Sequence, residues 1–190
     1  MSRADVCSLG DPPIAPEVSI VVPLLRRVDL IEHQLAQFAA DPELAECELI
    51  YVVADPEQAE LAREIVTELY ALYGLPLRLL ALTAPGDRPL ACQLGAASAR
   101  AQRLLFLGSD VIPQHPGWVG HLTAALDAEP AVAAAAPTLL DADGEIARAG
   151  SSPACLLVDA AAEGGELAHV HEAELFRLEG LGAEPVEAGG

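Results

Sequence analysis

The sequence contains no lysine and no asparagine, and it has only one tryptophan and one methionine. All ten basic residues are arginine, against 29 acidic residues, so the formal net charge at pH 7 is −19. Nucleic acids and anionic membranes are bound by clustered cations, and this shortage of positive charge argues against both as partners. A GC-rich coding sequence explains the composition, and a halophilic host is the alternative.

Long apolar runs are also missing. Although 52% of the residues are hydrophobic, none of the runs approaches the ~20 residues that span a bilayer. The N-terminus carries no basic-then-apolar signal segment. The four cysteines are widely spaced and form no Cys-x-x-Cys pair, which favours reduced structural thiols over a disulfide framework or a zinc site. We therefore expect one soluble, cytoplasmic domain with no transmembrane segment.

The order of the apolar segments predicts the fold class. Four runs are apolar on both faces, as buried parallel strands are: VSIVVPLL (18–25), CELIYVVAD (47–55), LPLRLLALT (75–83) and RLLFLGSD (103–110). Segments with helical periodicity separate them. This alternation predicts an α/β domain over residues 18–150, with a Rossmann-like, mostly parallel sheet and helices on both faces. Residues 1–17, polar and Pro-rich, are expected to be a flexible lead-in.

The expected helices carry recognisable end signals. Asp29 and Glu32 match a capping box before the helix that continues to residue 40. Pro56 suits a first helical turn, and Gly74 suits the position just after the helix that follows. The apolar stripe of that second helix is expected at Leu61, Ile65, Leu69 and Leu72.

The pattern weakens after the chain's only tryptophan. A short helix is expected over residues 117–130, followed by two extended segments around the turn DADG (141–144), which lacks the further ligands of a calcium loop. Residues 151–190 form an atypical acidic segment, in which SSPACLLVD predicts one more strand and the remainder is weakly helical. His169 and His171 lack a third ligand at zinc spacing, so solvated histidines are expected.

Two carboxylates follow predicted parallel strands. Because the carboxyl ends of such strands meet at one edge of the sheet, where ligands bind, Asp55 and Asp110 are expected to converge there. A helix N-cap would also explain Asp55, which precedes Pro56. Asp110 is followed by Val-Ile-Pro, where no helix begins, and an unsatisfied carboxylate at a buried strand end costs several kcal/mol. Asp110 is therefore predicted to hold a ligand or a metal ion.

Common catalytic and nucleotide-binding motifs are absent. The sequence contains neither Gly-x-Gly-x-x-Gly nor a Walker loop, and no serine lies in a Gly-x-Ser-x-Gly elbow. These absences argue against the usual dinucleotide and NTP cradles and against the usual hydrolase nucleophile.

Taken together, the ordered segments resemble the nucleotide-sugar-binding half of family 2 glycosyltransferases, which have the GT-A fold. The resemblance covers about residues 18–150. It rests on four segments: VSIVVPLLRRVDLIEHQLAQFAADPE, ELIYVVADPEQ, RPLACQLGAASARAQRLLFLGSDVIPQHPGWV and VAAAAPTLLDADGEIARAG. Gly108 and Gln93 stand where the family commonly has asparagine, and the family's acceptor-half motifs have no clear counterpart after Gly150.

The resemblance implies a function and a set of site residues. It implies a protein that transfers a sugar from a nucleotide-diphosphate donor to an acceptor hydroxyl with inversion, the acceptor being a glycan, a lipid or a protein. The residues implied to contact the nucleotide are Pro23, Leu24, Leu25, Asp55, Gln93 and Ser109. Asp110 would hold Mg²⁺ or Mn²⁺ on the diphosphate, and the only candidates for a catalytic base are Glu172 and Glu174. Two alternatives stay open: a GT-A domain that binds a nucleotide sugar or a protein without catalysis, and a purely structural α/β module.

Overall fold

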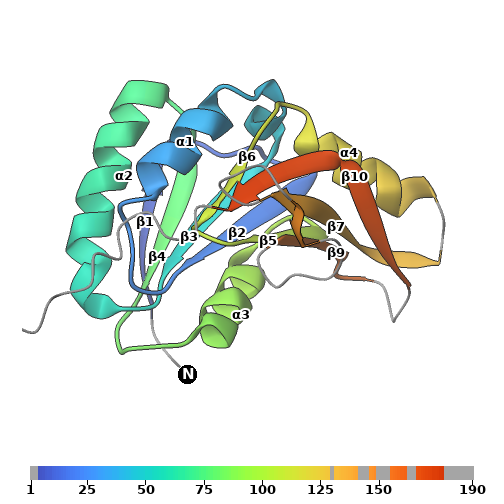
Figure 1. Ribbon diagram of the computed structural model, residues 1–190. Coiled ribbons are helices and arrows are strands. Elements are labelled where there is room, and N and C mark those ends of the chain that lie inside the picture. Colours follow the sequence, from blue (N-terminus) through green and yellow to red (C-terminus); the bar gives the residue numbers. More distant parts are fainter. Residues whose placement is uncertain (1–3, 129–130, 141–145, 149–154, 162–165, 178–190) are drawn as a thin grey trace, which may run out of the picture.

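One mixed sheet organises the molecule (Figure 1). The computed structural model describes residues 4–128, 131–140, 146–148, 155–161 and 166–177. The strands are β1 (Ala4–Leu9), β2 (Val18–Leu24), β3 (Glu48–Val53), β4 (Leu77–Leu82), β5 (Arg103–Leu107), β6 (Val111–Pro113), β7 (Val132–Leu140), β8 (Ile146–Arg148), β9 (Cys155–Asp159) and β10 (Glu166–Arg177). The helices are α1 (Ile31–Ala39), α2 (Ala59–Tyr73), α3 (Arg88–Ser98) and α4 (Trp118–Ala128), with short 3₁₀ turns η1 (Pro42–Glu46) and η2 (Pro56–Gln58).

The order of strands across the sheet is β1-β4-β3-β2-β5-β9-β7-β10-β6, and β8 pairs with β7. Strands β4, β3, β2 and β5 are parallel to their neighbours in this series. Strand β9 is antiparallel to both β5 and β7, and β10 is parallel to β7. The two outermost strands are each antiparallel to their neighbour: β1 pairs with β4, and β6 pairs with β10. The predicted α/β class with a mostly parallel sheet is confirmed.

Helices cover both faces of the sheet, as predicted. Alternate side chains of β2 point to opposite sides: Ile20 and Val22 join a core with α1, α2 and α4, whereas Val21 joins a smaller core beneath α3. Figure 1 shows α3 apart from the other three helices. Gly95 of α3 lies so close to β2 that a Cβ atom there would be 2.3 Å from Cγ1 of Val21. A glycine at this position therefore permits the close packing of α3 on the sheet.

The expectation of a flexible lead-in is wrong for residues 4–9. These residues form β1, which pairs antiparallel with β4 from Ala4↔Leu82 to Leu9↔Leu77. The side chains of Cys7 and Leu9 pack against the main core, while Val6 is 60% exposed. An edge strand needs only one apolar face and one pairing partner, so six residues of mixed polarity suffice.

One detail of the expected helices is wrong, and a second is wrong in part. The capping box does not form, because Asp29 pairs with Arg27 and α1 begins with Leu30 as an N-cap that makes no side-chain hydrogen bond. In α2 the buried face consists of Ala62, Val66 and Leu69.

Two of the four residues of the expected stripe on α2 are confirmed, because Leu69 is buried and Ile65 packs against the core, whereas the other two face outward. Leu61 and Leu72 are 48% and 70% exposed. Ala62 is fully buried, so its small side chain brings the helix close to the sheet. Gly74 ends α2 in the left-handed conformation, with φ 67°, as predicted.

The Pro-Gly-Trp sequence has a structural role. Gly117, with φ 87°, donates its N–H to Oδ2 of Asp41 at 3.0 Å just before α4 begins. Gly120 donates to Oε2 of Glu43 at 3.0 Å, so carboxylates around η1 satisfy two free N–H groups at the start of α4. The Trp118 ring is stacked on Phe38 of α1 with centroids 6.3 Å apart. This turn therefore joins α4 to α1 and η1.

Part of the C-terminal segment belongs to the sheet. The predicted strand in SSPACLLVD is confirmed as β9. The weak helical tendency expected beyond it is wrong over residues 166–177, which form β10 alongside β7. Pairing with a buried neighbour outweighs the local helical preference of a segment rich in Ala, Leu and Glu. The DADG turn between β7 and β8 lies outside the described residues.

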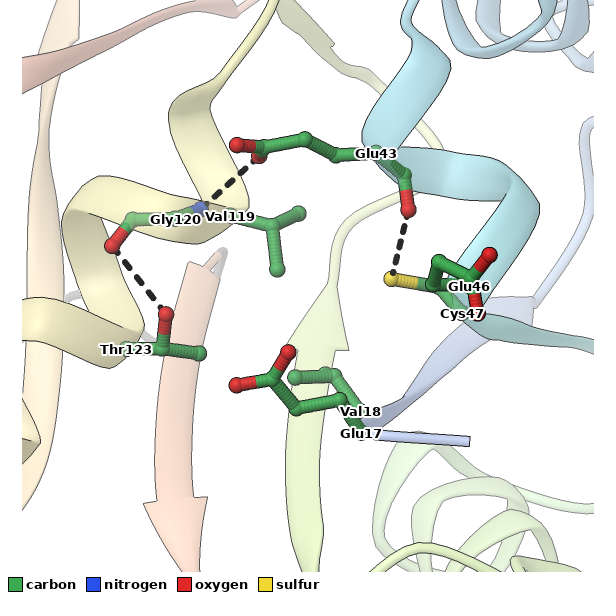
Figure 2. Close-up of a pocket in the computed structure, with 8 residues that line it drawn as sticks. All are labelled: Glu17, Val18, Glu43, Glu46, Cys47, Val119, Gly120 and Thr123. Atoms are coloured by element: carbon green, nitrogen blue, oxygen red, sulfur yellow. Dashed lines mark hydrogen bonds between the residues drawn. The ribbon is translucent and has the colours of Figure 1, made fainter. Parts of the chain in front are cut away.

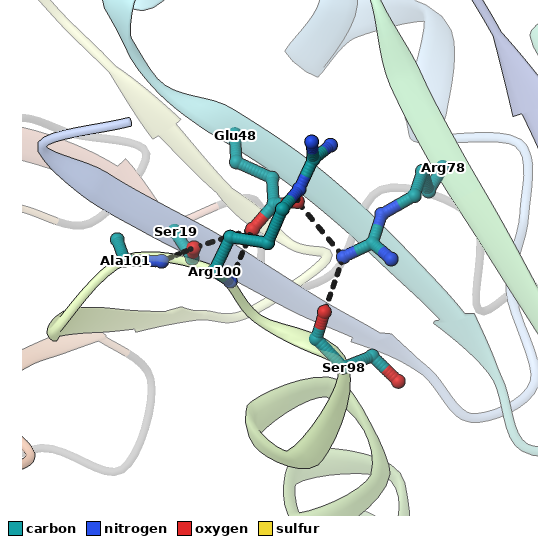
Figure 3. A network of polar contacts seen from close by, with 6 residues as sticks. All are labelled: Ser19, Glu48, Arg78, Ser98, Arg100 and Ala101. Carbon is teal, nitrogen blue, oxygen red and sulfur yellow. Dashed lines mark hydrogen bonds and ion pairs between the residues drawn. The ribbon is translucent and has the colours of Figure 1, made fainter. Parts of the chain in front are cut away.

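A buried carboxylate accepts hydrogen bonds from several segments at the edge of the sheet where the parallel strands begin (Figure 3). Glu48, at the start of β3, accepts from Ser19 Oγ at 2.6 Å and from Arg78 Nη2 at 2.9 Å. Arg100 donates to the same carboxylate through both Nε and its backbone N. Strands β2, β3 and β4 and the loop after α3 are thereby held together at one point.

Candidate functional site

The sheet changes the direction of its connections between β2 and β5. From β2 the chain adds β3 and β4 on one side, and then β5 pairs on the other side of β2. The loops that leave β2 and β5 therefore diverge at the carboxyl ends of these strands. In open α/β sheets, ligands bind at such a switch point. Asp110 lies on the loop after β5, and Asp55 lies two strands away, after β3.

Backbone hydrogen bonds align the loops at this edge. Ala54 N donates to Leu24 O at 2.8 Å, and Gly86 N donates to Ala54 O at 2.8 Å. The hydrogen-bonded alignment of β2, β3 and β4 thus continues one step beyond the strands themselves. The loop residues that follow these three strands are therefore held in fixed relative positions at the carboxyl edge of the sheet.

Asp55 caps the 3₁₀ turn that leads into α2. Its Oδ1 accepts from the backbone N of Glu57 at 3.1 Å, with Pro56 in the first position of the turn. The N-cap interpretation is confirmed. The residue is also partly exposed at the carboxyl edge. The implied contact with a nucleotide stays a prediction.

Asp110 lies on a tight turn and not at the end of a buried strand. Strand β5 ends at Leu107, and Val111 N donates to Gly108 O at 3.1 Å, which closes the turn that carries Ser109 and Asp110. Both side chains are partly exposed. Asp110 is therefore less buried than the sequence pattern predicts, because the strand stops three residues earlier than its apolar run suggests. Its location at the switch point remains the reason to expect a ligand.

A buried glutamine holds this turn from below. Gln34 of α1 is fully buried, and its Nε2 donates to Gly108 O and to Val111 O, both at 2.8 Å. Tyr51 donates its hydroxyl to Oε1 of Gln34 at 3.2 Å. Gln34 is not among the site residues predicted from the sequence. The available signal was a polar residue on the apolar stripe of α1, between Ile31 and Leu35.

The other residues implied to bind nucleotide have different surroundings. Pro23 and Leu24 are buried within β2, paired with Val52 and Val53, so only their backbone could face a ligand. Leu25, at the rim, is 37% exposed. Gln93 is exposed on α3.

The two candidate bases belong to one strand of the sheet. Glu172 and Glu174 lie on β10, and Glu174 is paired with Thr138 of β7. Arg177, at the end of β10, is opposite Val111. The end of β10 at Arg177 is therefore the part of this strand nearest to Asp110, and both glutamates lie before it in the chain. Their role as a catalytic base stays a prediction.

An open, mainly apolar pocket of about 290 Å³ lies on the α3 face. Its lining residues are Arg88, Pro89, Cys92, Phe106 and Leu156. The first turn of α3, the last part of β5 and the first part of β9 all lie at the carboxyl edge, so this pocket opens beside the switch point. Burial raises the pKa of the Cys92 thiol against the opposing charge of Arg88. Cys92 is thus an uncharged lining group at neutral pH.

A second pocket, of about 140 Å³, lies at the opposite edge, between η1, α4 and the start of β2 (Figure 2). Its lining includes Glu17, Glu43 and Glu46. Burial, with the charges of these glutamates, raises the pKa of Cys47 to about 12, so the thiol stays protonated at neutral pH. Three carboxylates repel an anionic ligand. The chemistry expected of a diphosphate site therefore does not fit this pocket.

The donor set near Asp110 fits a cation that a substrate helps to hold. Among the described residues, no group of three or more His, Cys, Asp or Glu side chains is placed to hold a metal ion. A preformed cage is not required, because Mg²⁺ is commonly held by one or two carboxylates together with substrate phosphates and water. Asp110, partly exposed on a fixed turn, could supply such a carboxylate.

The described helices give no indication of a membrane span. None of them is both long enough and apolar enough to cross a bilayer.

Comparisons with known proteins identify the fold. No family model matches the chain, and no curated protein matches its sequence. The mannosyltransferase PcManGT from Pyrobaculum calidifontis, in complex with GDP-Man and Mn²⁺, superposes with a TM-score of 0.70 at 13% identity, over 88% of this chain and 58% of its own. TarS from S. aureus (residues 1–349) superposes with a TM-score of 0.62 at 17% identity, over 76% of this chain and 47% of its own. Its complex with UDP-GlcNAc gives 0.59 at 16% identity, over 76% of this chain and 46% of its own.

The chain spans about half the length of these solved structures. At these identities the superpositions show a shared fold. The sheet order, the helices on both faces and these superpositions lead to one conclusion: the chain has the GT-A-like fold of glycosyltransferases.

Proposed function

We propose that this chain is the nucleotide-sugar-binding part of a glycosyltransferase. It would transfer a sugar from a nucleotide-diphosphate donor to an acceptor hydroxyl, with inversion and with a divalent cation. The observation that carries this proposal is the position of Asp110, on a fixed turn at the switch point of a GT-A-like sheet. Asp55 lies two interstrand spacings away, about 10 Å along the same edge.

The two carboxylates have different proposed tasks. Asp55, at the rim after β3, would accept hydrogen bonds from the ribose or the base. Asp110, on the turn after β5, would hold Mg²⁺ or Mn²⁺ together with the diphosphate. The solved neighbours support a nucleotide-sugar donor, since one is a complex with GDP-Man and Mn²⁺ and another is a complex with UDP-GlcNAc.

The cation also resolves an electrostatic difficulty. A protein with a net charge of −19 repels a diphosphate unless positive charge lies between them. When bound, the cation would neutralise charge on the departing diphosphate. The chain's own contribution is to hold Asp110 in place and to orient the nucleotide along the edge between β3 and β5.

Inversion requires a base near the sugar's anomeric carbon. The base removes the proton of the acceptor hydroxyl. At the same time the hydroxyl oxygen bonds to the anomeric carbon, and the bond between that carbon and the diphosphate breaks. Glu172 and Glu174 are the proposed candidates. In the alternative function, the domain binds a nucleotide sugar without transferring it.

A thermal-shift titration with UDP, GDP and dTDP, each with and without Mn²⁺, tests the proposal. We expect at least one nucleotide to raise the melting temperature of the wild-type chain, and to raise it more when Mn²⁺ is present. If no nucleotide stabilises the chain under any condition, the proposal is wrong in both its forms. If a nucleotide does stabilise the chain, an assay for release of free sugar, or for its transfer from the matching nucleotide sugar, distinguishes an enzyme from a binding module.

A further inference from the structure

The amide of Gln34 connects the core of the protein with the turn that carries Asp110. Its Nε2 donates at 2.8 Å to Gly108 O, just before Ser109 and Asp110, and at 2.8 Å to Val111 O, just after them. One side chain thus grips both ends of a two-residue segment. Gln34 belongs to α1, 74 residues before Gly108 in the chain.

The chemistry of this contact fixes the orientation of the amide. Backbone carbonyls only accept, so the group that faces Gly108 and Val111 must be the amide nitrogen with its two N–H donors. The amide oxygen then faces Tyr51, whose hydroxyl donates to it at 3.2 Å. Both Gln34 and Tyr51 are fully buried, so water does not compete for these bonds.

The helix gains nothing in packing from a glutamine here. Residues 31, 34, 35 and 38 are the buried residues of α1, and the other three are Ile, Leu and Phe. An apolar residue at position 34 would add to the same core, whereas a buried amide carries a desolvation cost that its hydrogen bonds must offset. The distinctive effect of glutamine is to fix the turn from Gly108 to Val111.

We propose that Gln34 is a positioning residue for Asp110. By holding the carbonyls on either side of Ser109 and Asp110, it keeps the carboxylate where the cation and the diphosphate must meet. This inference rests on the proposed function, in which Asp110 binds the cation. Groups that orient a metal ligand commonly change metal affinity by 10- to 100-fold when they are removed.

Three variants test this role. Gln34→Met keeps the length of the side chain and removes all three hydrogen bonds. Tyr51→Phe keeps the ring and removes only the bond that orients the amide. Ser19→Ala is the matched control, because it also removes buried hydrogen bonds, with Glu48 and Ala101, but at the opposite edge of the sheet.

The main readout is Mn²⁺ affinity, measured by electron paramagnetic resonance with the best-binding nucleotide of UDP, GDP and dTDP present. All measurements are made well below the melting temperature of each variant. We expect Gln34→Met to weaken Mn²⁺ binding by about 10- to 100-fold, Tyr51→Phe to weaken it less, and Ser19→Ala to leave it unchanged. Nucleotide affinity without metal should stay the same in all three, which a general loss of structure would not produce.

Amide hydrogen exchange gives a second readout that does not depend on ligand binding. Faster exchange at Val111 N in Gln34→Met, but not in Ser19→Ala, would show that Gln34 holds the turn from Gly108 to Val111, because this N–H closes the turn. If the wild type binds Mn²⁺ with a nucleotide and Gln34→Met binds it equally well, the positioning role is wrong and the proposed function stands. If the wild type binds no Mn²⁺ with any of the nucleotides, the positioning role and the proposed metal-dependent function are both wrong. Should Gln34→Met fail to fold, Tyr51→Phe decides by the same comparison.

Discussion

Arg100 contacts Glu48 twice: its Nε donates to Oε1 at 2.7 Å, and its backbone N donates to Oε2 at 2.8 Å. The Glu48 carboxylate is fully buried, and Ser19 and Arg78 supply its remaining partners. A buried carboxylate with this many charged and neutral donors is stable only while all of them are present. The edge opposite the candidate site therefore depends on one side chain.

Replacing Glu48 should destabilise the chain strongly. In Glu48→Ala the two arginines and Ser19 lose this shared acceptor, and we expect the free energy of unfolding to fall by about 3–5 kcal/mol in urea titrations. Glu60→Ala is the control. Glu60 also pairs with an arginine, Arg63, but its side chain is 79% exposed, so its loss should change stability by less than about 1 kcal/mol. Equal effects of the two substitutions would contradict this account of the network.

The same carboxylate should contribute to unfolding in acid. Burial alone would raise the pKa of Glu48, but the hydrogen bonds from Ser19 and Arg100 and the charge of Arg78 outweigh burial and hold it below its ordinary value of 4.5. The folded state thus binds a proton at Glu48 less readily than the unfolded state does.

Glu48 therefore contributes stability that is fully present above pH 4.5 and is lost as the pH falls through the lowered pKa of the folded state. Urea titrations at a series of pH values between neutral and acid should show the wild type losing more stability over this window than Glu48→Gln. Parallel curves for the two proteins would contradict the prediction.

The packing of α3 on the sheet should tolerate little at Gly95. A Cβ atom there would lie 2.3 Å from Cγ1 of Val21, so Gly95→Ala is expected to lower the free energy of unfolding by about 1–3 kcal/mol. The double variant Val21→Ala/Gly95→Ala provides the control, since it removes the methyl group that the new side chain would meet. Its loss of stability should be smaller than the sum of the two single losses. Strict additivity would show that the close approach is not the cause.

Features encoded by neighbouring residues could be predicted from the sequence. Apolar runs such as 18–25 gave the parallel strands, Asp55 before Pro56 gave a cap, and Gly74 gave a helix end. Features that depend on distant partners could not be predicted this way. Glu48 finds its arginines 30 and 52 residues away.

The candidate site was predictable in outline only. The topology of the sheet was enough to bring Asp55 and Asp110 to one edge. The hydrogen bonds from Gln34 to the turn could not be predicted, because a single glutamine on an apolar helix stripe does not indicate which backbone groups it will contact. The burial of Asp110 was overstated for a related reason: hydrophobicity in RLLFLGSD does not reveal that pairing in β5 stops at Leu107.

Capping and ligand binding by Asp55 can be separated by substitution. Asp55→Ser keeps a short side-chain acceptor for the Glu57 N–H, so stability should change little, whereas Asp55→Ala should lose about 1 kcal/mol. If Asp55 also contacts the nucleotide, both variants should weaken nucleotide affinity by about tenfold, the equivalent of one lost hydrogen bond to a charged group. An unchanged affinity in Asp55→Ser would reduce Asp55 to a cap.

The proposed role of Asp110 is tested most directly by calorimetric titration of the best-binding nucleotide, with and without Mn²⁺, into the wild type and into Asp110→Asn. Asparagine matches the size of the side chain and removes its charge, so any loss concerns the bond to the cation. We predict that Mn²⁺ strengthens nucleotide binding to the wild type and that this gain disappears in Asp110→Asn, while the metal-free affinity stays similar. A gain from Mn²⁺ that is equally large in Asp110→Asn would contradict the assignment of Asp110 as the metal ligand.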